Sequence, residues 1–336
     1  GVLYSNPSQA NPDQFDLKFS ITSGPYVVSE VGDKNILLSK NPMYPDGNDL
    51  SPHKVNFVSH PEAQKLASLK SGKTDFTVTM NSSSVNDPAI VSTHPHIGFT
   101  YWLTINPLSK KFKDKKSRHS LQALLNSADL SFSEVPDSWK PASQLYLPDG
   151  LGRPSRKELD TAWEEVNRSK SDADLPKSLS LLIDKTFPLK TQIINRLKKF
   201  NIEPNVTEYD SQEEFYNFFK KNQYDVLQNN NDFSSSSLVS NILVTFNESR
   251  PLIILEENST IRIRLSNLKS EAEPLKRHIL LKEIGIKLLT DGNIVPIAHH
   301  LITFFSNKKI DITNWSTLFP EIAFWKSRWT ASSEKN

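Results

Sequence analysis

The sequence of 336 residues contains no cysteine. This absence excludes disulfide bonds, thiolate metal sites and a cysteine nucleophile within these residues. It fits an exported protein that folds without disulfides, although many cytosolic proteins share it. The sequence also lacks any run approaching the roughly 18 consecutive apolar residues that would predict a membrane-spanning helix.

Neither sign of charge dominates the sequence. The 40 Lys and Arg residues stand against 38 Asp and Glu residues, which leaves a net charge of +2. This balance gives no electrostatic reason to expect nucleic acid as a partner. The most basic segment, Lys110 to Arg118, is interrupted by Asp114 and contains Phe112 as its one aromatic residue. We interpret it as a solvated surface.

Motifs of catalysis and of metal binding are missing. There is no Gly-x-Ser-x-Gly elbow, His-Glu-x-x-His pair, P-loop or Gly-x-Gly-x-x-Gly. His94 and His96 could face one side of a strand, but no third ligand is near, so surface histidines are favoured over a metal site. His299 and His300 would face opposite sides of a strand. We therefore expect no enzyme, no cofactor and no metal.

The first residues, 1–6, have neither the charged region nor the apolar run of a signal peptide. An exported form would therefore carry a leader that is not among these residues.

Residues 1–80 show the pattern hairpin, strand, helix, strand. Turn residues Gly32 and Asp33 separate two apolar runs, and Pro61 begins a helix that Gly72 is placed to end. The predicted elements are strands at 26–28, 36–38, 55–58 and 75–80 and a helix at 61–71.

The rest of the chain alternates strands and helices, which is typical of an α/β fold. Residues 129–176 are rich in Pro, Ser and Asp and are expected to be mostly loop. Residues 228–237 are expected to form a polar loop. The predicted strands are 96–105, 179–183, 224–227 and 294–305, and the predicted helices are 118–128, 159–166, 192–200, 211–219 and 274–291.

Seven segments of the chain form a recognisable series of short motifs. They are Thr22-Ser23-Gly24-Pro25-Tyr26, Asn41-Pro42-Met43-Tyr44, Leu69 to Phe76, Asn106 with Phe112 to Leu121, Leu147-Pro148-Asp149-Gly150, Ile193 to Ile202, and Tyr224-Asp225-Val226. In this order they resemble segments of the dipeptide/oligopeptide-binding class of ABC-importer solute-binding proteins. Each alone is a weak match, but their common order over most of the chain is specific.

The resemblance implies an α/β fold of the type II periplasmic-binding-protein kind, with two lobes that close on a ligand by hinge motion. The family's N-terminal segment and small extra domain are not found, so we expect a C-terminal portion or a natural variant. Residues 1–105, with 300–336 returning, would form part of the first lobe, and residues 106–299 the C-terminal lobe.

The hinge crossings are expected near 101–107 and 298–305. Aromatic side chains there often face the cleft, because they give contact area at low entropy cost. Tyr101 and Trp102 are candidates, and strand alternation implies that only one of them faces the ligand. His299 is a further candidate for lining the hinge.

In peptide receptors of this family an aspartate after the Tyr-Asp-Val strand binds the ligand's α-ammonium group. By position Asp232 resembles that aspartate, with Asn230, Asn231 and Phe233 beside it. The family's Gly-Trp before the aspartate and Pro after it are missing here, which leaves a solvated polar loop as an even alternative.

We interpret the protein as a periplasmic or extracellular receptor that is monomeric and could be lipid-anchored. It would bind a peptide-like ligand and present it to a membrane permease. One alternative is a cytoplasmic ligand-sensing domain of a transcriptional regulator. Another is a degenerate member of the class that serves as an interaction module.

Overall fold

The computed structural model describes residues 3–4, 21–22, 24–44, 52–80, 85–92, 96–146, 150, 152–171, 175–220, 224–231, 238–246, 252–257, 259–311 and 328–329. The chain divides into two compact units. Unit 1 comprises Gly1–Pro95 and Ile302–Asn336, and unit 2 comprises His96–Leu301. The chain therefore passes between the units near residues 95 and 302, and each unit is described by itself.

Unit 2 is built on a mixed sheet with the strand order β11-β10-β12-β8-β13. β10 pairs in parallel with β11 and β12, whereas β8 runs antiparallel to β12. Parallel neighbours need a crossover connection, which helices supply here. The strands are β8 (His96–Ile105), β9 (Trp139–Pro141), which pairs with β13, β10 (Ser178–Asp184), β11 (Glu203–Tyr209), β12 (Val226–Asn231) and β13 (Ile294–Asn307).

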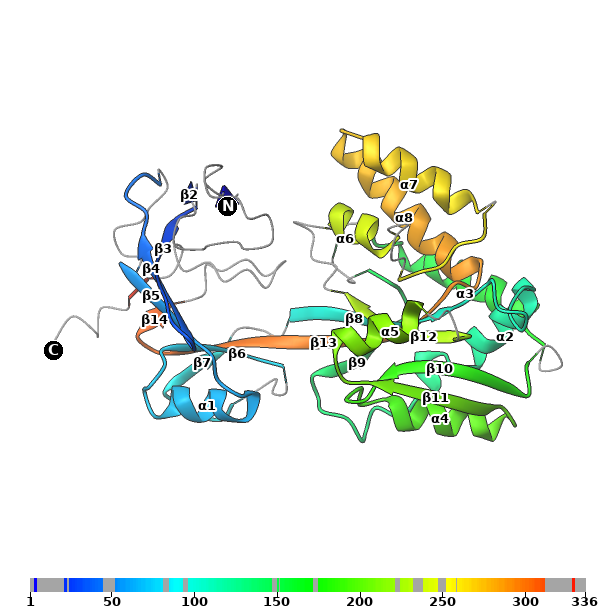
Figure 1. Cartoon of the computed structure of the whole chain (residues 1–336), viewed down its shortest axis with the longest axis horizontal. Helices are drawn as coiled ribbons and strands as arrows, with labels where there is room; N and C mark the ends of the chain where they lie inside the picture. The colour runs from blue at the N-terminus through cyan, green and yellow to red at the C-terminus, as the bar shows by residue number, and fades with distance from the viewer. Residues whose placement is uncertain are drawn as a thin grey trace. The chain divides into compact units, whose positions relative to one another are not determined.

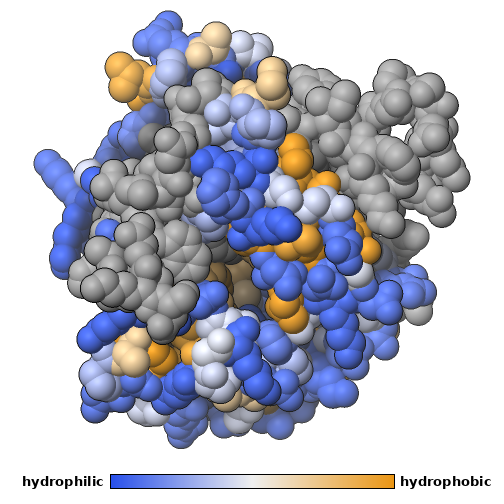
Figure 2. Space-filling model, turned by 90° about the vertical axis from the view of Figure 1, so that its left-hand side faces the viewer, coloured by the Kyte–Doolittle hydropathy of each residue, from blue (hydrophilic) through white to orange (hydrophobic). Residues whose placement is uncertain are grey.

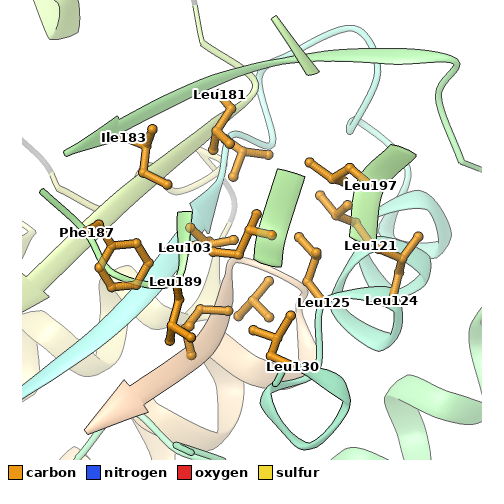
Figure 3. Packing of buried hydrophobic residues seen from close by; sticks show 14 of the residues in the cluster. Leu103, Leu121, Leu124, Leu125, Leu130, Leu181, Ile183, Phe187, Leu189 and Leu197 are labelled. Carbon is orange, nitrogen blue, oxygen red and sulfur yellow. The ribbon is translucent and has the colours of Figure 1, made fainter. Parts of the chain in front are cut away.

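Helices lie on both faces of this sheet (Figure 1). On one face, α2 (Lys115–Leu124) and α4 (Lys190–Lys199) contribute Leu121 and Leu197 to a cluster of buried hydrophobic side chains (Figure 3). Because successive strand residues point to opposite faces, Leu103 joins this cluster while Trp102 joins a second one.

The second cluster is enclosed by α6 (Leu238–Thr245), α7 (Thr260–Ser270) and α8 (Pro274–Thr290). A third, smaller cluster lies under α5 (Gln212–Lys220), where Phe215 packs with Leu182 and Leu227. α3 (Arg156–Ser169) begins with a capping box between Ser155 and Glu158 and contacts α2 and α8. A 3-10 turn covers Ser127–Asp129.

Unit 1 contains a three-stranded antiparallel sheet in the order β3-β4-β5. α1 ends where Gly72 adopts a φ of 71°, the left-handed conformation that favours glycine at a helix end. β6 and β7 pair with the second half of β13. The elements are β1 (Leu3–Tyr4), β2 (Ile21–Thr22), β3 (Tyr26–Val31), β4 (Asn35–Lys40), β5 (Lys54–Val58), α1 (Glu62–Lys70), β6 (Phe76–Thr79), β7 (Ile90–Ser92), β14 (Ile310–Asp311) and β15 (Arg328–Trp329).

The structure confirms the α/β pattern and corrects one predicted loop. β12 continues through the polar residues to Asn231, because Gln228 to Asn231 pair in register with Thr100 to Leu103 of β8. Backbone pairing therefore outweighs the weak strand propensity of asparagine. The pattern also missed β9, β11, α6 and α7. Among the described residues, no helix has the length and apolar character needed to cross a membrane.

Candidate functional site

Three parallel strands of unit 2 end at the same edge of its sheet. β10 ends at Asp184, β11 at Tyr209 and β12 at Asn231, and Asp184 lies opposite Tyr209 in the β10–β11 register. Ligands of open α/β sheets bind at the carboxyl ends of the strands. We call this edge, with Asp184, Tyr209 and Asn230 on it, the carboxyl edge.

β8 brings an aromatic residue to the carboxyl edge from the opposite direction. Because β8 is antiparallel to β12, Tyr101 in the middle of β8 lies opposite Asn230 near the end of β12. The Tyr101 ring stacks on Phe187 with centroids 5.4 Å apart and lies 4.7 Å from Trp139. Burial, and then the charge of Asp184, raises the pKa of Tyr101 to about 12, so its hydroxyl stays protonated at neutral pH.

Gln228 ties two of the strand ends together beneath this edge. Its Oε1 atom accepts a hydrogen bond from the Asp184 backbone N–H at 3.1 Å and one from the Tyr209 hydroxyl at 3.3 Å. Gln228 is fully buried, and its Nε2 atom has no hydrogen-bond partner among the described residues. Burial, then the charges of Asp184 and Tyr101, raises the pKa of Tyr209.

The charges at the carboxyl edge are mostly paired with one another. Lys190 forms an ion pair with Glu208 at 2.9 Å, and the Lys185 ammonium lies 3.7 Å from the Asp210 carboxylate. Asp184 instead accepts two hydrogen bonds of 2.7 Å from the backbone N–H and hydroxyl of Thr186, both on Oδ1. The Asp184 carboxylate therefore has no cationic side chain as a partner among the described residues.

The two adjacent aromatic candidates point to opposite faces of the sheet, as alternation predicts. Tyr101 is half-buried at the carboxyl edge, whereas Trp102 has no exposed surface. Trp102 packs in the second cluster and donates its Nε1–H to Thr104 Oγ1 at 3.1 Å. Trp102 is thus a core residue in this structure, and we do not include it in the proposed ligand site.

The asparagines of the predicted site lie at the end of β12. Asn230 is exposed, and Asn231 is half-buried with its Nδ2 donating to Thr245 Oγ1 at 3.2 Å. The other two candidates of this segment, Asp232 and Phe233, lie outside the described residues. Their roles, like those of Asn230 and Asn231, stay predictions.

The candidate His299 is buried in β13, and its Nδ1 atom lies 3.1 Å from Thr100 Oγ1. Burial lowers the pKa of His299 to about 4, so it is neutral at pH 7. His300 packs with its ring stacked on Trp139 at 4.1 Å. His94 lies outside the described residues, and among those described no three potential ligands are grouped to hold a metal.

The pattern of residues along the chain did not single out Asp184, Tyr209 or Gln228. The signal that could have found them is topological, because each stands at or near the end of a strand in one parallel set. That signal depends on predicting β11, which was missed since Pro204 and Asn205 interrupt its apolar pattern.

Residues 3–250 match the family described as bacterial extracellular solute-binding proteins, family 5, middle region. The chain belongs to this family. The predicted resemblance to the dipeptide/oligopeptide-binding class is thereby confirmed. No curated protein matches the sequence.

Solved structures share the fold of this family-5 chain at low sequence identity. AppA from Clostridium difficile superposes with a TM-score of 0.70 at 17% identity, covering 92% of this chain and 67% of AppA. NikA from Brucella suis gives 0.68 at 13% identity, covering 92% and 68%. The periplasmic murein tripeptide binding protein MppA gives 0.64 at 17% identity, covering 91% and 63%. The predicted fold, that of type II periplasmic binding proteins, is confirmed, and the chain spans about two thirds of the length of these structures.

Several segments that carry the family resemblance hold the sheet together away from the carboxyl edge. The Asn106 side chain donates to the Tyr224 carbonyl at 3.1 Å, and its backbone N–H donates to the Asp225 carbonyl at 2.9 Å. The buried Asp225 carboxylate accepts from Lys111 Nζ at 2.9 Å, from the Ser180 N–H at 2.8 Å and from the Ser109 hydroxyl. These contacts fix the amino end of β12.

The basic segment of the family-5 chain is only partly solvated. Arg118 is 3% exposed and donates to the carbonyls of Phe112, Lys113 and Asp291. Lys115 pairs with Glu165 at 3.0 Å on the surface. The interpretation as a solvated face is therefore wrong for Arg118, because its buried guanidinium donates hydrogen bonds to three carbonyl groups.

Proposed function

We propose that this chain is the ligand-binding part of an ABC-importer receptor, which holds a peptide-like ligand at the carboxyl edge of unit 2 and delivers it to a membrane permease. The family assignment supports solute binding. The family's description as extracellular supports a periplasmic or extracellular location.

The observation that carries the proposal is the convergence of three different strands on one edge. Tyr101 from β8 supplies an aromatic surface, Asp184 from β10 supplies a carboxylate that has no cationic partner in the described part of the chain, and Asn230 from β12 supplies an exposed amide. Ligand sites combine apolar or aromatic lining with a few polar groups that fix orientation. A peptide can use both, because its apolar side chains pack on an aromatic surface while its backbone and termini form hydrogen bonds.

Solved structures of this fold support the ligand class. One is a dipeptide binding protein from Pseudoalteromonas sp. SM9913 in complex with Met-Leu, and another is DppA from Helicobacter pylori in complex with the peptide STSA. NikA from Brucella suis was solved with Fe(III)-EDTA, so metal chelates are the competing class. A peptide is favoured here because Asp184 and the predicted Asp232 would attract its ammonium group, whereas both would repel an anionic chelate.

The proposed delivery step depends on a difference in affinity. Two α/β lobes that close by hinge motion are predicted from the sequence, and a ligand drives closure only when it binds the closed form better than the open form. Presentation to the permease would then follow from recognition of the closed form.

Native mass spectrometry of the purified protein, in search of a retained ligand, tests the proposal first. Calorimetric titration with Met-Leu, with the peptide STSA and with Fe(III)-EDTA then assigns the class. Tyr101→Ala and Asp232→Ala should each weaken peptide binding by about tenfold or more, since each removes a central contact. Asp160→Ala, an exposed change in α3, is the matched control and should leave affinity unchanged.

Two results would contradict the proposal. Retention of Fe(III)-EDTA without either peptide would overturn the peptide class. If neither Tyr101→Ala nor Asp232→Ala affects peptide binding, the ligand does not bind at the carboxyl edge.

A further inference from the structure

The carboxyl edge of unit 2 places a carboxylate beside two tyrosine residues. Asp184 at the end of β10 lies opposite Tyr209 at the end of β11 in the register of the two strands. The Phe187 backbone N–H donates to the Asp184 carbonyl at 3.1 Å, and the Phe187 ring stacks on Tyr101. Burial, and then the charge of Asp184, raises the pKa of both Tyr101 and Tyr209, so both hydroxyl groups lie within electrostatic reach of the carboxylate.

The Asp184 carboxylate is held in place but is only partly satisfied. Its Oδ1 atom accepts hydrogen bonds from the backbone N–H and the hydroxyl of Thr186, each at 2.7 Å. Its Oδ2 atom has no hydrogen-bond or ion-pair partner in the described part of the chain. Asp184 is half-buried. A carboxylate in this setting forms its strongest hydrogen bonds with a cation.

The lysines next to Asp184 are engaged with other groups. Lys190 Nζ pairs with Glu208 at 2.9 Å and donates to the Lys185 carbonyl at 3.1 Å. The Lys185 ammonium lies 3.7 Å from the Asp210 carboxylate. The charges of these two pairs cancel, so Asp184 adds a negative charge that no described side chain compensates.

The two tyrosines suit a long side chain with a positive end. The Tyr209 hydroxyl donates toward Gln228 and keeps its lone pairs as acceptors, and the Tyr101 hydroxyl has no hydrogen-bond partner among the described residues. Lysine and arginine combine an apolar stem with a cationic head. The half-buried Tyr101 ring offers a surface for the stem, while the tyrosine oxygens and the Asp184 carboxylate offer acceptors for the head.

The described surface of unit 1 gives no such indication of a ligand. Figure 2 views the molecule from the side that carries unit 1, where hydrophobic side chains (orange) show between hydrophilic ones (blue). A groove of about 510 Å³ lies beside β5, but its lining is mostly uncharged. Volume without a distinctive set of polar groups does not identify a ligand.

We propose that Asp184 and the hydroxyl groups of Tyr101 and Tyr209 form a subsite for a basic side chain, so that the peptides bound by this protein carry lysine or arginine. This assignment rests on the proposed function, because it concerns one part of the same ligand. The predicted role of Asp232 is to bind the α-ammonium group, which leaves Asp184 for a second positive charge. The stem of the basic side chain would pack on Tyr101, and its head would pair with Asp184.

Isothermal titration calorimetry with matched tripeptides tests the subsite. Lys-Ala-Ala, Ala-Lys-Ala and Ala-Ala-Lys are each compared with a counterpart in which norleucine replaces lysine, since norleucine keeps the apolar stem without the ammonium group. In at least one position the lysine peptide should bind about tenfold more tightly, because it gains a charge-assisted hydrogen bond. The same series with arginine against citrulline repeats the comparison for a guanidinium group.

The variant Asp184→Asn connects this preference to the carboxylate. It should bring the affinities for the charged and neutral peptides within about twofold of each other, because the amide keeps an acceptor for Thr186 but carries no charge. Asp160→Asn removes an exposed carboxylate in α3, so it is the matched control and should leave the preference intact. The comparison uses a ratio of two affinities, which does not change if part of a variant is unfolded.

Acetylation of the peptides' N-terminus separates the side chain from the α-ammonium group. Acetylated peptides should bind more weakly overall, but their preference for the basic side chain should persist and should still depend on Asp184. If the effect of Asp184→Asn instead disappears on acetylation, Asp184 binds the α-ammonium group and the proposed subsite is wrong.

The remaining outcomes distinguish this subsite from the proposed function. If peptides bind without preferring lysine to norleucine or arginine to citrulline, the subsite is overturned and the proposed function stands. A preference that survives Asp184→Asn would likewise overturn the subsite. If no peptide binds at all, the proposed function itself is contradicted, and the subsite with it.

Discussion

Gly285 in α8 lies directly against the ring of Tyr146. A Cβ atom on Gly285 would stand 2.6 Å from Cε2 of Tyr146, well inside normal contact distance. Tyr146 is 1% exposed and also lies 3.4 Å from the position that a Cβ on Gly152 would occupy. The glycine in the helix is therefore needed for space, and the aromatic ring fills the space that it leaves.

Gly285→Ala should destabilise the protein despite the better helix propensity of alanine. Propensity would gain about 1 kcal/mol, whereas overpacking a closed core costs about 1–3 kcal/mol. Because Tyr146 is enclosed, we expect the cost to exceed the gain, with a net loss of up to about 2 kcal/mol, measured by urea unfolding. Tyr146→Leu should suppress the loss in the double variant, and Ser266→Ala in α7 should show almost no change. Equal losses with and without Tyr146→Leu would show that the ring is not the obstacle.

The buried Asp225 carboxylate should contribute strongly to stability. It is 7% exposed and accepts from Ser109, Lys111 and the Ser180 N–H. Asp225→Ala leaves the Ser180 N–H without its partner, so the free energy of unfolding should fall by about 2–4 kcal/mol. Asp129→Ala is the matched control, since Asp129 also pairs with a cation, Arg196 at 2.7 Å, but is exposed and should cost below about 1 kcal/mol. Similar losses for the two variants would contradict the role of burial.

The structure shows which parts of the fold a sequence pattern can predict. The helix from Pro274 and the strand ending at Asn307 have strong apolar periods and were predicted within a few residues. β12 was cut short at Leu227 because its last residues are polar, and only pairing with β8 makes them a strand. Long-range partners of this kind are not visible in a local pattern.

The candidate site was predictable only in part for the same reason. Tyr101 was a candidate because it stands in an apolar strand at an expected crossing, and its role in binding stays a prediction. Asp184 and Gln228 acquire their positions from contacts between strands that are 44 residues apart in sequence. No local feature of either residue indicates that contact.

His299 should make stability depend on pH in the acid range. Burial lowers its pKa to about 4, whereas an exposed histidine titrates near 6.5. Between these values the unfolded chain binds more protons than the folded one, so stability is full above pH 6.5 and falls as the pH decreases toward 4. The shift corresponds to at most about 3 kcal/mol. Urea unfolding between pH 4 and 7 should show a shallower fall for His299→Asn than for the wild type.

His53→Asn is the matched control for this titration, because His53 is exposed. The fall in stability that His299 causes should remain in this variant. His119, whose pKa is also lowered by burial, will contribute a fall of the same sign in every variant. A His299→Asn profile parallel to that of the wild type would contradict the assignment.

Gln228 should couple to Tyr209 across the carboxyl edge. Its Oε1 atom accepts from the Tyr209 hydroxyl and from the Asp184 N–H, and Gln228→Met removes both bonds at nearly constant volume. We expect the free energy of unfolding to fall by about 1–3 kcal/mol, because the Asp184 N–H is left without its acceptor.

Gln228→Glu keeps the two acceptor bonds but places a charge in a buried position near Asp184. Burial raises the pKa of such a carboxyl group, so this variant should be less stable than the wild type at pH 7. Its stability relative to the wild type should rise as the pH is lowered toward 5.

Double-mutant cycles with Tyr209→Phe, read by urea unfolding, measure the coupling directly. A coupling energy of zero, together with a Gln228→Glu variant that shows no recovery at low pH, would mean that Gln228 does not connect the ends of β10 and β11.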